Sequence, residues 1–250
     1  MVRGIYVAAS GMRTQVENQD VIANNLANAD TPGFKKDTLM VGSFPQFLIQ
    51  RIDDVSDEGR PPVIGSFSLG SEPAGVATDF SSGGIVSTQR NLDFAISGRG
   101  FFVIQTPQGI RYTRAGSFTR SSDGLLVTTE GYPVLGENGR IDIGDGEFSV
   151  SSAGDVIVDG QVVNRISVVD IAPAELVKEG DSLFAARQGA GVTPAEGYSV
   201  LQGYLESSNV NIVQEMVKMI TGLRAYEANQ KVLKMEDETL GKLINEGLRV

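Results

Sequence analysis

The chain closes with SSNVNIVQEMVKMITGLRAYEANQKVLKMEDETLGKLINEGLRV, residues 207–250, and this stretch decides the fold. Its apolar side chains recur every seven residues, in one row of Ile212, Met219, Tyr226, Leu233 and Leu240 and a second row of Met216, Leu223 and Ile244. Such spacing marks one face of a long helix that packs against other helices. A helix of about 35 residues is about 50 Å long, more than a small domain can cover. The alternative is a helix docked along its own domain. Asn209 or Ser208 is expected to cap the helix start.

The first 29 residues predict a second helix with a narrower apolar row. Ile5, Met12 and Leu26 follow a seven-residue spacing, and alanines run beside them. An alanine-rich row suits close helix–helix contact, although an ordinary amphipathic surface helix would also carry one. Thr31-Pro32-Gly33 ends this helix, because proline cannot donate to the helical ladder and glycine accepts a positive φ.

The middle of the chain changes to short apolar or alternating runs separated by turn signals. Asn138-Gly139 and Asp159-Gly160 suit two-residue hairpin turns, which need positive φ angles. Residues 76–206 therefore predict a central all-β domain. Residues 33–75 show no clean period and predict an extended connector with one or two short strands or turns.

These patterns predict an α+β chain with three parts. The N- and C-terminal helices, residues 1–32 and 207–250, would form one discontinuous coiled-coil domain. The connector covers 33–75 and the β domain 76–206.

Composition excludes several classes of function. The net charge is −10 and no basic patch stands out, so nucleic acid is not an expected partner. The chain has no cysteine and no histidine, which removes thiolate nucleophiles, the usual general base and the commonest metal ligands. No stretch has the roughly 18–20 apolar residues that span a membrane, so membrane insertion is not expected. The N-terminus lacks the apolar core of a secretory signal.

The remaining candidate sites are weak. Asp142, Asp145 and Glu147 could hold Ca²⁺, but their spacing is not that of a twelve-residue calcium loop. Gly98-Arg99-Gly100 lacks the third glycine and the helix of a dinucleotide loop. The acidic residues between Asp53 and Glu58 could bind a cation or set register at a subunit boundary, or form only a solvated loop. No catalytic, cofactor-binding or metal-binding residue is predicted.

Four ordered stretches resemble the axial rod and hook proteins of the bacterial flagellum. They are 8–12 leading to Ile22-Ala23-Asn24-Asn25-Leu26-Ala27-Asn28 and Thr31-Pro32-Gly33-Phe34-Lys35; 93–102, DFAISGRGFF; 112–118, YTRAGSF, with 131–136, GYPVLG; and 203–210, GYLESSNV, with 224–229, RAYEAN. The resemblance runs from end to end. The length and the stretches 136–141 and 178–184 look most like the proximal-rod member, and the distal-rod member is the alternative.

The resemblance implies a structural subunit of the basal-body rod rather than an enzyme. The terminal helices would pair at the inner wall of a helical tube that transmits torque and surrounds the export channel. The expected partners are copies of the chain, other rod proteins and the flagellar export apparatus. The expected location is the rod in the periplasm, reached without cleavage of a signal peptide.

The same resemblance assigns one set of side chains to an assembly interface at the inner wall. It comprises Ile5, Met12, Leu26, Ile212, Met219, Leu223, Tyr226, Leu233 and Leu240. Two rival functions remain: a secreted acidic hydrolase or glycan-binding β domain with helical arms, and an accessory protein that scaffolds the rod without staying in it. The first would need a convergent carboxylate pair or an aromatic platform, and neither stands out.

Overall fold

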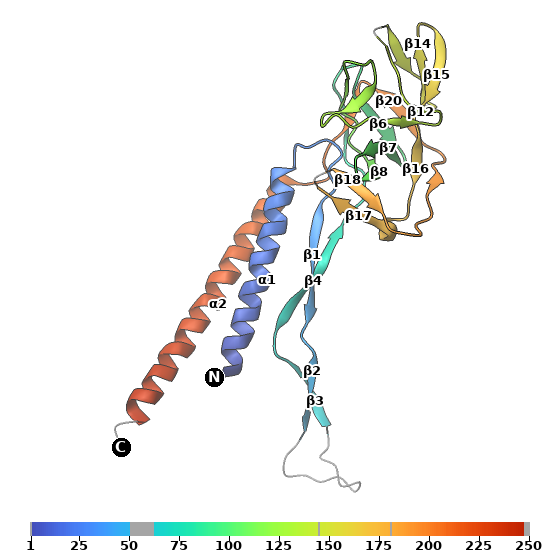
Figure 1. The fold of residues 1–250 in the computed structure, drawn as a ribbon. Coiled ribbons are helices and arrows are strands. Elements are labelled where there is room, and N and C mark those ends of the chain that lie inside the picture. Colours follow the sequence, from blue (N-terminus) through green and yellow to red (C-terminus); the bar gives the residue numbers. More distant parts are fainter. Residues whose placement is uncertain (1, 51–62, 145, 181, 248–250) are drawn as a thin grey trace. The chain divides into compact units, whose positions relative to one another are not determined.

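The two termini form long helices, and the chain between them is rich in strands. The computed structural model describes residues 2–50, 63–144, 146–180 and 182–247. Helix α1 is Val2–Ala27 and helix α2 is Ile212–Gly247 (Figure 1). The predicted α+β class is therefore confirmed.

Contacts group the chain into two units. The helical unit comprises the described residues of Met1–Leu26, Asp37–Ala77 and Ile212–Val250, and the β unit those of Ala27–Lys36 and Thr78–Asn211. The predicted three-part division at residues 33, 76 and 207 stays a prediction. It differs from this grouping mainly because strands of the expected connector belong with the helices.

Local sequence determines where α1 ends, whereas contacts with distant residues affect the segment before α2. Helix α1 ends before Pro32 and Gly33, and Gly33 takes a φ of 69°. Helix α2 begins at Ile212, later than expected. The expectation that Asn209 caps this helix is wrong, because its side-chain oxygen accepts a hydrogen bond from the Lys36 N–H instead, at 2.7 Å.

The expected connector contains four strands. β1 (Asp37–Ser43) pairs with β4 (Ser71–Thr78), and β2 (Gln46–Gln50) pairs antiparallel with β3 (Val63–Ser68), with Phe47 opposite Phe67. Glycines and prolines interrupt the alternation of apolar and polar residues in this part of the sequence. The pattern therefore did not predict all four strands. The acidic run between Asp53 and Glu58 lies outside the described residues.

The β unit is built around a six-stranded sheet with the order β17-β18-β8-β7-β16-β19. Its strands are β7 (Phe101–Thr106), β8 (Gly109–Thr113), β16 (Val168–Asp170), β17 (Leu176–Glu179), β18 (Leu183–Ala186) and β19 (Thr193–Pro194). A 3-10 helix, η1 (Pro173–Glu175), lies between β16 and β17 along the chain.

Shorter strands complete the unit. A three-stranded sheet contains β13 (Phe148–Val150), β14 (Asp155–Val158) and β15 (Gln161–Arg165). The remaining strands form pairs: β5 (Ile85–Ser87) with β21 (Tyr204–Glu206), β6 (Phe94–Ser97) with β20 (Ser199–Gln202), β9 (Phe118–Arg120) with β10 (Leu126–Thr128), and β11 (Leu135–Gly136) with β12 (Gly139–Arg140).

One hairpin turn lies at the dipeptide that predicted it, and a second is shifted by one residue from the predicted Asn138-Gly139. Asp159 and Gly160, with φ angles of 49° and 82°, join β14 to β15. Glu137 and Asn138 join β11 to β12, and Gly139 follows them with a φ of 99°. Positive φ at both central residues, as at Asp159 and Gly160, matches the right-handed twist of the flanking strands. The Asp159-Gly160 turn could therefore be predicted in full from the sequence, and the β11–β12 turn only in its approximate position.

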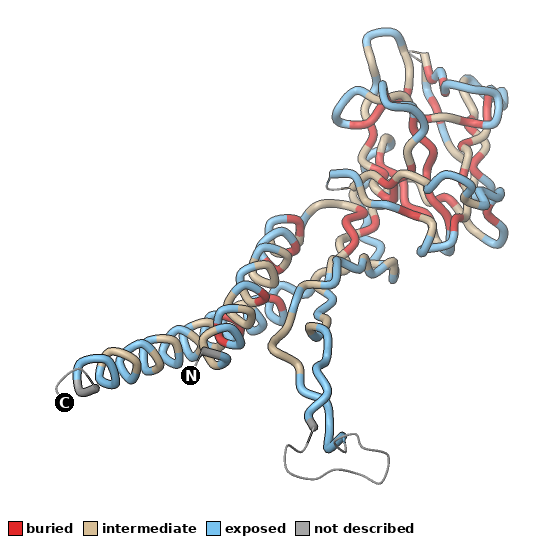
Figure 2. The backbone as a smooth tube through the Cα atoms, turned by 60° about the horizontal axis from the view of Figure 1, so that its bottom comes forward, coloured by how far each residue is buried: buried red, intermediate tan, exposed pale blue. Residues whose placement is uncertain are grey.

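Burial is concentrated in the β unit (Figure 2). One core contains the ring contacts of Phe102 and Phe94 with Phe118, and a second contains Phe101 packed on Phe184. The two helices and the β1–β4 strands carry many exposed apolar side chains instead. The described helices include no segment both long and apolar enough to cross a membrane.

Candidate functional site

The segments that enter and leave the β unit are tied to one another where they meet. The Asp79 N–H donates to the Lys36 carbonyl at 2.8 Å, and the Lys36 N–H donates to Asn209 Oδ1 at 2.7 Å. Asn209 Nδ2 closes the ring by donating to the Asp79 carbonyl at 2.8 Å. Each of three segments distant in sequence thus binds the other two. We call these residues, together with the buried ion pairs described next, the junction clasp.

Glu206 is the centre of the junction clasp. Its Oε1 accepts from Lys35 Nζ at 2.6 Å and from the Gly83 N–H at 2.9 Å, and its Oε2 accepts from Arg114 Nη1 at 3.2 Å. The Lys35 and Glu206 side chains are each only 1% exposed. Buried charges of this kind are tolerated only when they are paired and hydrogen-bonded. Carbonyl oxygens take the remaining donors, with Ser81 accepting from Lys35 and Gly98 from Arg114.

Burial dominates the electrostatics of the two cations. It lowers the pKa of Lys35 and the pKa of Arg114, while the Glu206 carboxylate opposes both shifts. The carboxylate is therefore what holds two charged groups inside the β unit. Both of its oxygens are occupied, so the cluster ties segments together and offers no free base. No metal-binding group of three or more acidic side chains occurs among the described residues.

Glycines allow the backbone to come close at the junction clasp. The Gly33 N–H donates to the Glu206 carbonyl at 2.7 Å, and a Cβ at Gly33 would overlap the backbone of Ala115. A Cβ at Gly83 would overlap the Ser207 carbonyl oxygen. Next to this contact, Lys178 Nζ lies 3.8 Å from the centroid of the Phe34 ring. The stretch Thr31-Pro32-Gly33-Phe34-Lys35 thus does more than end α1, because Gly33, Phe34 and Lys35 pack closely in the β unit.

In the helical unit, α1 and α2 run antiparallel, side by side (Figure 1). A Cβ added at Gly4 would lie 2.5 Å from Glu236 Oε1, and one added at Gly11 would lie 2.9 Å from Asn229 Nδ2. Further along, Gly222 faces Gln15 in the same way. Small residues at seven-residue intervals thus let polar side chains of the other helix approach closely.

Asn25 joins three elements at the end of α1. Its side chain donates to the Asp37 carbonyl at 2.7 Å and accepts from the Asp37 N–H at 2.9 Å. It also donates to Glu215 Oε2 at 3.5 Å, and Glu215 accepts from Lys218 at 2.7 Å. Asn25 and Glu215 are both buried. This role could not be predicted from the sequence, because one asparagine has no local pattern that marks distant partners.

The predicted interface residues divide into two groups. Those that are half-buried are Ile5, Met12 and Leu26 on α1, and Met219, Tyr226, Leu233 and Leu240 on α2. The α2 members lie on the face of Glu215, Gly222, Asn229 and Glu236, which is the face toward α1. Ile212 and Leu223 are instead exposed, by 39% and 44%. The α2 members of the first group therefore lie toward α1, while Ile212 and Leu223 lie outside this seam, and the interface as a whole stays a prediction.

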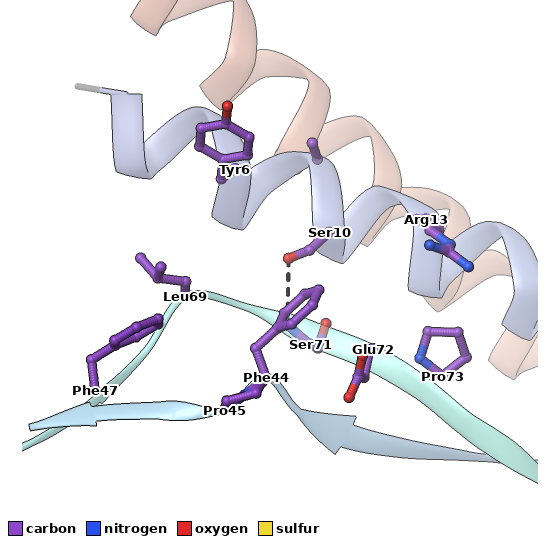
Figure 3. A pocket seen from close by; sticks show the side chains of 11 residues that line it. Tyr6, Ser10, Arg13, Phe44, Pro45, Phe47, Leu69, Ser71, Glu72 and Pro73 are labelled. Atoms are coloured by element: carbon purple, nitrogen blue, oxygen red, sulfur yellow. Dashed lines mark hydrogen bonds between the residues drawn. The ribbon is translucent and has the colours of Figure 1, made fainter.

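An apolar groove opens between α1 and the strands of the helical unit (Figure 3). Its volume is about 560 Å³, and Tyr6, Phe44, Phe47 and Leu69 are among its lining residues. A second cavity of about 640 Å³ shares Phe47 and Leu69 with it and reaches Arg3. We call the two together the helix–hairpin groove. Ser10 and Thr14 of α1 hold its strands through hydrogen bonds with Ser71, of which the Ser71 N–H to Ser10 Oγ bond measures 3.4 Å.

Three family descriptions match successive parts of the chain. Residues 5–35 match "Flagella basal body rod protein", residues 95–164 match "Flagellar hook protein FlgE/F/G D1 domain", and residues 201–246 match "Flagellar basal body rod FlgEFG protein C-terminal". The junction clasp draws on all three regions, since Lys35, Arg114 and Glu206 fall within them.

Relatives match over nearly their whole length. The flagellar basal-body rod protein FlgG of Bacillus subtilis is 36% identical over 98% of this chain and 99% of its own length. FlgF of Caulobacter vibrioides is 38% identical over 96% of this chain and 94% of its own. FlgG of Agrobacterium fabrum is 32% identical over 99% of this chain and 100% of its own length. With its ordered motifs, its junction clasp and these relatives, the chain belongs to the flagellar basal-body rod protein family and is a structural subunit of the rod.

Proposed function

We propose that the chain is a proximal-rod subunit that polymerises into the helical tube around the export channel and transmits torque. The observation that carries the proposal is the helical unit. It has a seven-residue seam between α1 and α2, yet leaves large apolar side chains exposed on both helices and on β1–β4. Surfaces of this extent on a free chain mark contacts with other subunits. The distal rod is the alternative position.

The terminal helices are proposed to act as a coiled coil at the inner wall. The spacing of Met219, Tyr226, Leu233 and Leu240 supports it, as does the close approach at Gly4 and Gly11. Small residues allow two helices to pack tightly in a wall that surrounds a narrow channel. The nine predicted interface residues remain the proposed packing set, and Ile212 and Leu223 would contact neighbouring subunits rather than α1.

The family assembles with other rod proteins of the basal body, and its members are structural proteins rather than an enzyme class. We propose that this chain likewise has no catalytic role and no cofactor, and that it contacts the export apparatus on its way out. It would reach the periplasm unfolded and without signal cleavage, and neither bind nucleic acid nor insert into a membrane. The acidic composition supports the absence of nucleic-acid binding, and the lack of histidine and cysteine supports the absence of a catalytic role.

The test is to delete the gene in its host, restore it with a tagged copy and isolate basal bodies. We expect loss of motility on deletion, recovery with the tagged chain, and the tag at the proximal end of the rod by electron microscopy. A tag at the distal end would establish the alternative. A chain that restores motility but is missing from washed basal bodies would instead be an accessory protein.

A further inference from the structure

The paired strands β1 and β4 gain little stability from burial. We call this pair the β1/β4 ribbon. Both strands are described in full, and each of their residues is either exposed or only half-buried. They form a sheet of two strands. Two strands by themselves are at best marginally stable in water and need further strands or a packed helix. Contacts outside the ribbon must therefore hold it.

Asn25 of α1 holds the end of the ribbon at which β1 begins. Its side-chain amide donates to the Asp37 carbonyl at 2.7 Å and accepts from the Asp37 N–H at 2.9 Å. One side chain thus binds both main-chain groups of the first residue of β1. Asn25 is buried, so loss of these bonds would leave polar groups unpaired away from water. The contact needs a donor and an acceptor on one short side chain, which an amide provides.

A second contact with α1 holds the opposite end of the ribbon. The Phe44 N–H donates to the Gly70 carbonyl at 3.1 Å, so the two strands meet where β1 ends and β4 begins. Ser71 is the first residue of β4. Its hydroxyl oxygen lies 3.1 Å from that of Thr14, which is buried, and its N–H donates to Ser10 Oγ at 3.4 Å (Figure 3). The ribbon is therefore attached to α1 at both ends.

The two attachments have matching separations on the ribbon and on α1. β1 extends from Asp37 to Ser43, which is about 20 Å at about 3.3 Å per residue of strand. On α1, Asn25 lies 11 residues from Thr14 and 15 from Ser10, which is about 17 and about 22 Å at about 1.5 Å per residue of helix. This agreement indicates that β1 runs along α1 in the opposite chain direction.

Asn25 also connects the ribbon with the helix pair. The same amide donates to Glu215 Oε2 at 3.5 Å. Glu215 is buried and lies in the first turn of α2. Asn25 thus contacts the first residue of β1 and the first turn of α2 at the same time. Pairing of the helices and alignment of the ribbon are coupled through this one side chain.

We propose that Asn25 is a positioning residue that aligns the β1/β4 ribbon along α1, with the Ser71 contacts as the second point of attachment. The ribbon then takes its direction from α1 and becomes ordered when α1 pairs with α2. The inference rests on the proposed rod function, in which the helices pair stably in contact with other subunits. In the rod, the alignment would present exposed apolar side chains of the ribbon, such as Met40 and Val76, to neighbouring subunits in a fixed direction.

Disulfide trapping measures the alignment at the end of the ribbon that is distant from Asn25. The chain has no native cysteine, and the Thr14 and Ser71 hydroxyl oxygens are 3.1 Å apart, so Thr14→Cys with Ser71→Cys provides an intramolecular pair. Tagged chains enter basal bodies beside wild-type copies and are oxidised there. We expect Asn25→Asp to slow formation of the 14–71 disulfide about tenfold, because a carboxylate cannot donate to the Asp37 carbonyl.

Two controls separate alignment of the ribbon from loss of the helix. Asn24→Asp makes the same substitution at the preceding residue, which is exposed, and should leave the rate unchanged. Gly11→Cys with Asn229→Cys reports the helix pair, since a Cβ at Gly11 lies 2.9 Å from Asn229 Nδ2. The 11–229 disulfide should form in Asn25→Asp at the wild-type rate. Equal loss of both disulfides would show that α1 has separated from α2, and would overturn a specific role in aligning the ribbon.

A double variant separates the lost hydrogen bond from repulsion between carboxylates. Glu215→Gln combined with Asn25→Asp removes the like charges, so this variant also serves if the added charge keeps Asn25→Asp out of rods. Its 14–71 rate should stay low, because the Asp37 carbonyl still lacks the amide donor of Asn25. A rate restored to that of Glu215→Gln alone would assign the loss to repulsion and overturn the attachment at Asp37.

The outcomes for the two proposals are distinct. A 14–71 rate in Asn25→Asp equal to that in Asn24→Asp overturns the alignment by Asn25 and leaves the rod function intact. Absence of the wild-type chain from basal bodies prepared in parallel overturns the rod function itself. The alignment is then tested by the same two disulfides in the purified full chain.

Discussion

At the scale of single residues, Glu206 decides how the β unit holds its entering and leaving segments. One carboxylate accepts from Lys35, Arg114 and the Gly83 N–H. Replacing it leaves two cations buried without their counter-charge. Removal of one partner from a buried ionic cluster typically costs about 3–5 kcal/mol, whereas an exposed pair contributes about 0–1 kcal/mol.

We therefore expect Glu206→Gln to destabilise the β unit by about 3–5 kcal/mol, because the amide is neutral and cannot replace the carboxylate. Denaturant unfolding, monitored by intrinsic tyrosine fluorescence, measures this change in the free energy of unfolding. Glu179→Gln is the matched control, since Glu179 pairs with Arg111 at 2.7 Å but is 47% exposed, and it should cost less than about 1 kcal/mol. Equal effects of the two substitutions would show that burial of the junction clasp has no energetic consequence.

Two neighbouring glycines provide a second test of the junction. A Cβ at Gly83 overlaps the Ser207 carbonyl oxygen, a backbone atom that cannot move without opening the junction. A Cβ at Gly84 lies 3.3 Å from Ser207 Oγ, a side-chain atom that needs to shift by only a few tenths of an ångström. Gly83→Ala should lower the unfolding midpoint by the equivalent of about 1–3 kcal/mol, and Gly84→Ala by much less. A larger loss for Gly84→Ala would contradict the close approach of the two segments at Gly83.

At the scale of elements, the seam between α1 and α2 combines apolar residues with polar residues and glycines. Half-buried Met219, Tyr226, Leu233 and Leu240 alternate along α2 with Glu215, Gly222, Asn229 and Glu236. Few of these side chains are fully buried, so one pair of helices gains little from the contact. Stability of the helices should then depend on further subunits.

The substitution Leu233→Asp tests the seam. A carboxylate at this half-buried position should abolish incorporation into rods, because the desolvation cost recurs in every subunit, while the β unit stays folded. Val232→Asp adds the same charge one residue away, at an exposed position, and should be incorporated at a reduced or normal level. Recovery of Leu233→Asp in purified rods at the wild-type level contradicts the proposed packing.

The elements that could be predicted from sequence are those with local signals. Seven-residue spacing located both helices, and Asp159-Gly160 located a hairpin turn, because each signal needs only neighbouring residues. Only one or two short strands or turns were expected where β1–β4 lie, because glycine and proline disrupt their alternation of apolar and polar residues. Lys35 and Glu206 are 171 positions apart, so no local pattern could pair them, and only the resemblance marked their surroundings.

At the scale of the whole molecule, the two units differ in how they are stabilised. The β unit has two apolar cores and the buried junction clasp. The helical unit has long, largely exposed elements, an open groove and exposed apolar side chains on α2. A free subunit would thus keep a folded β unit, while its helices reach their stable state only in contact with other copies. On the proposed function, such a chain would remain exportable until it meets the growing rod.

Folding of the terminal helices is therefore expected to be coupled to assembly, and limited proteolysis of the purified full chain tests this coupling most directly. Fragments are identified by mass over a time course. We expect a resistant core that contains residues 78–211, with both terminal helices trimmed early, and protection of the same helices in isolated basal bodies. A free chain whose α1 and α2 resist cleavage as well as the β unit would contradict the coupling, because the helices would then be stable on their own.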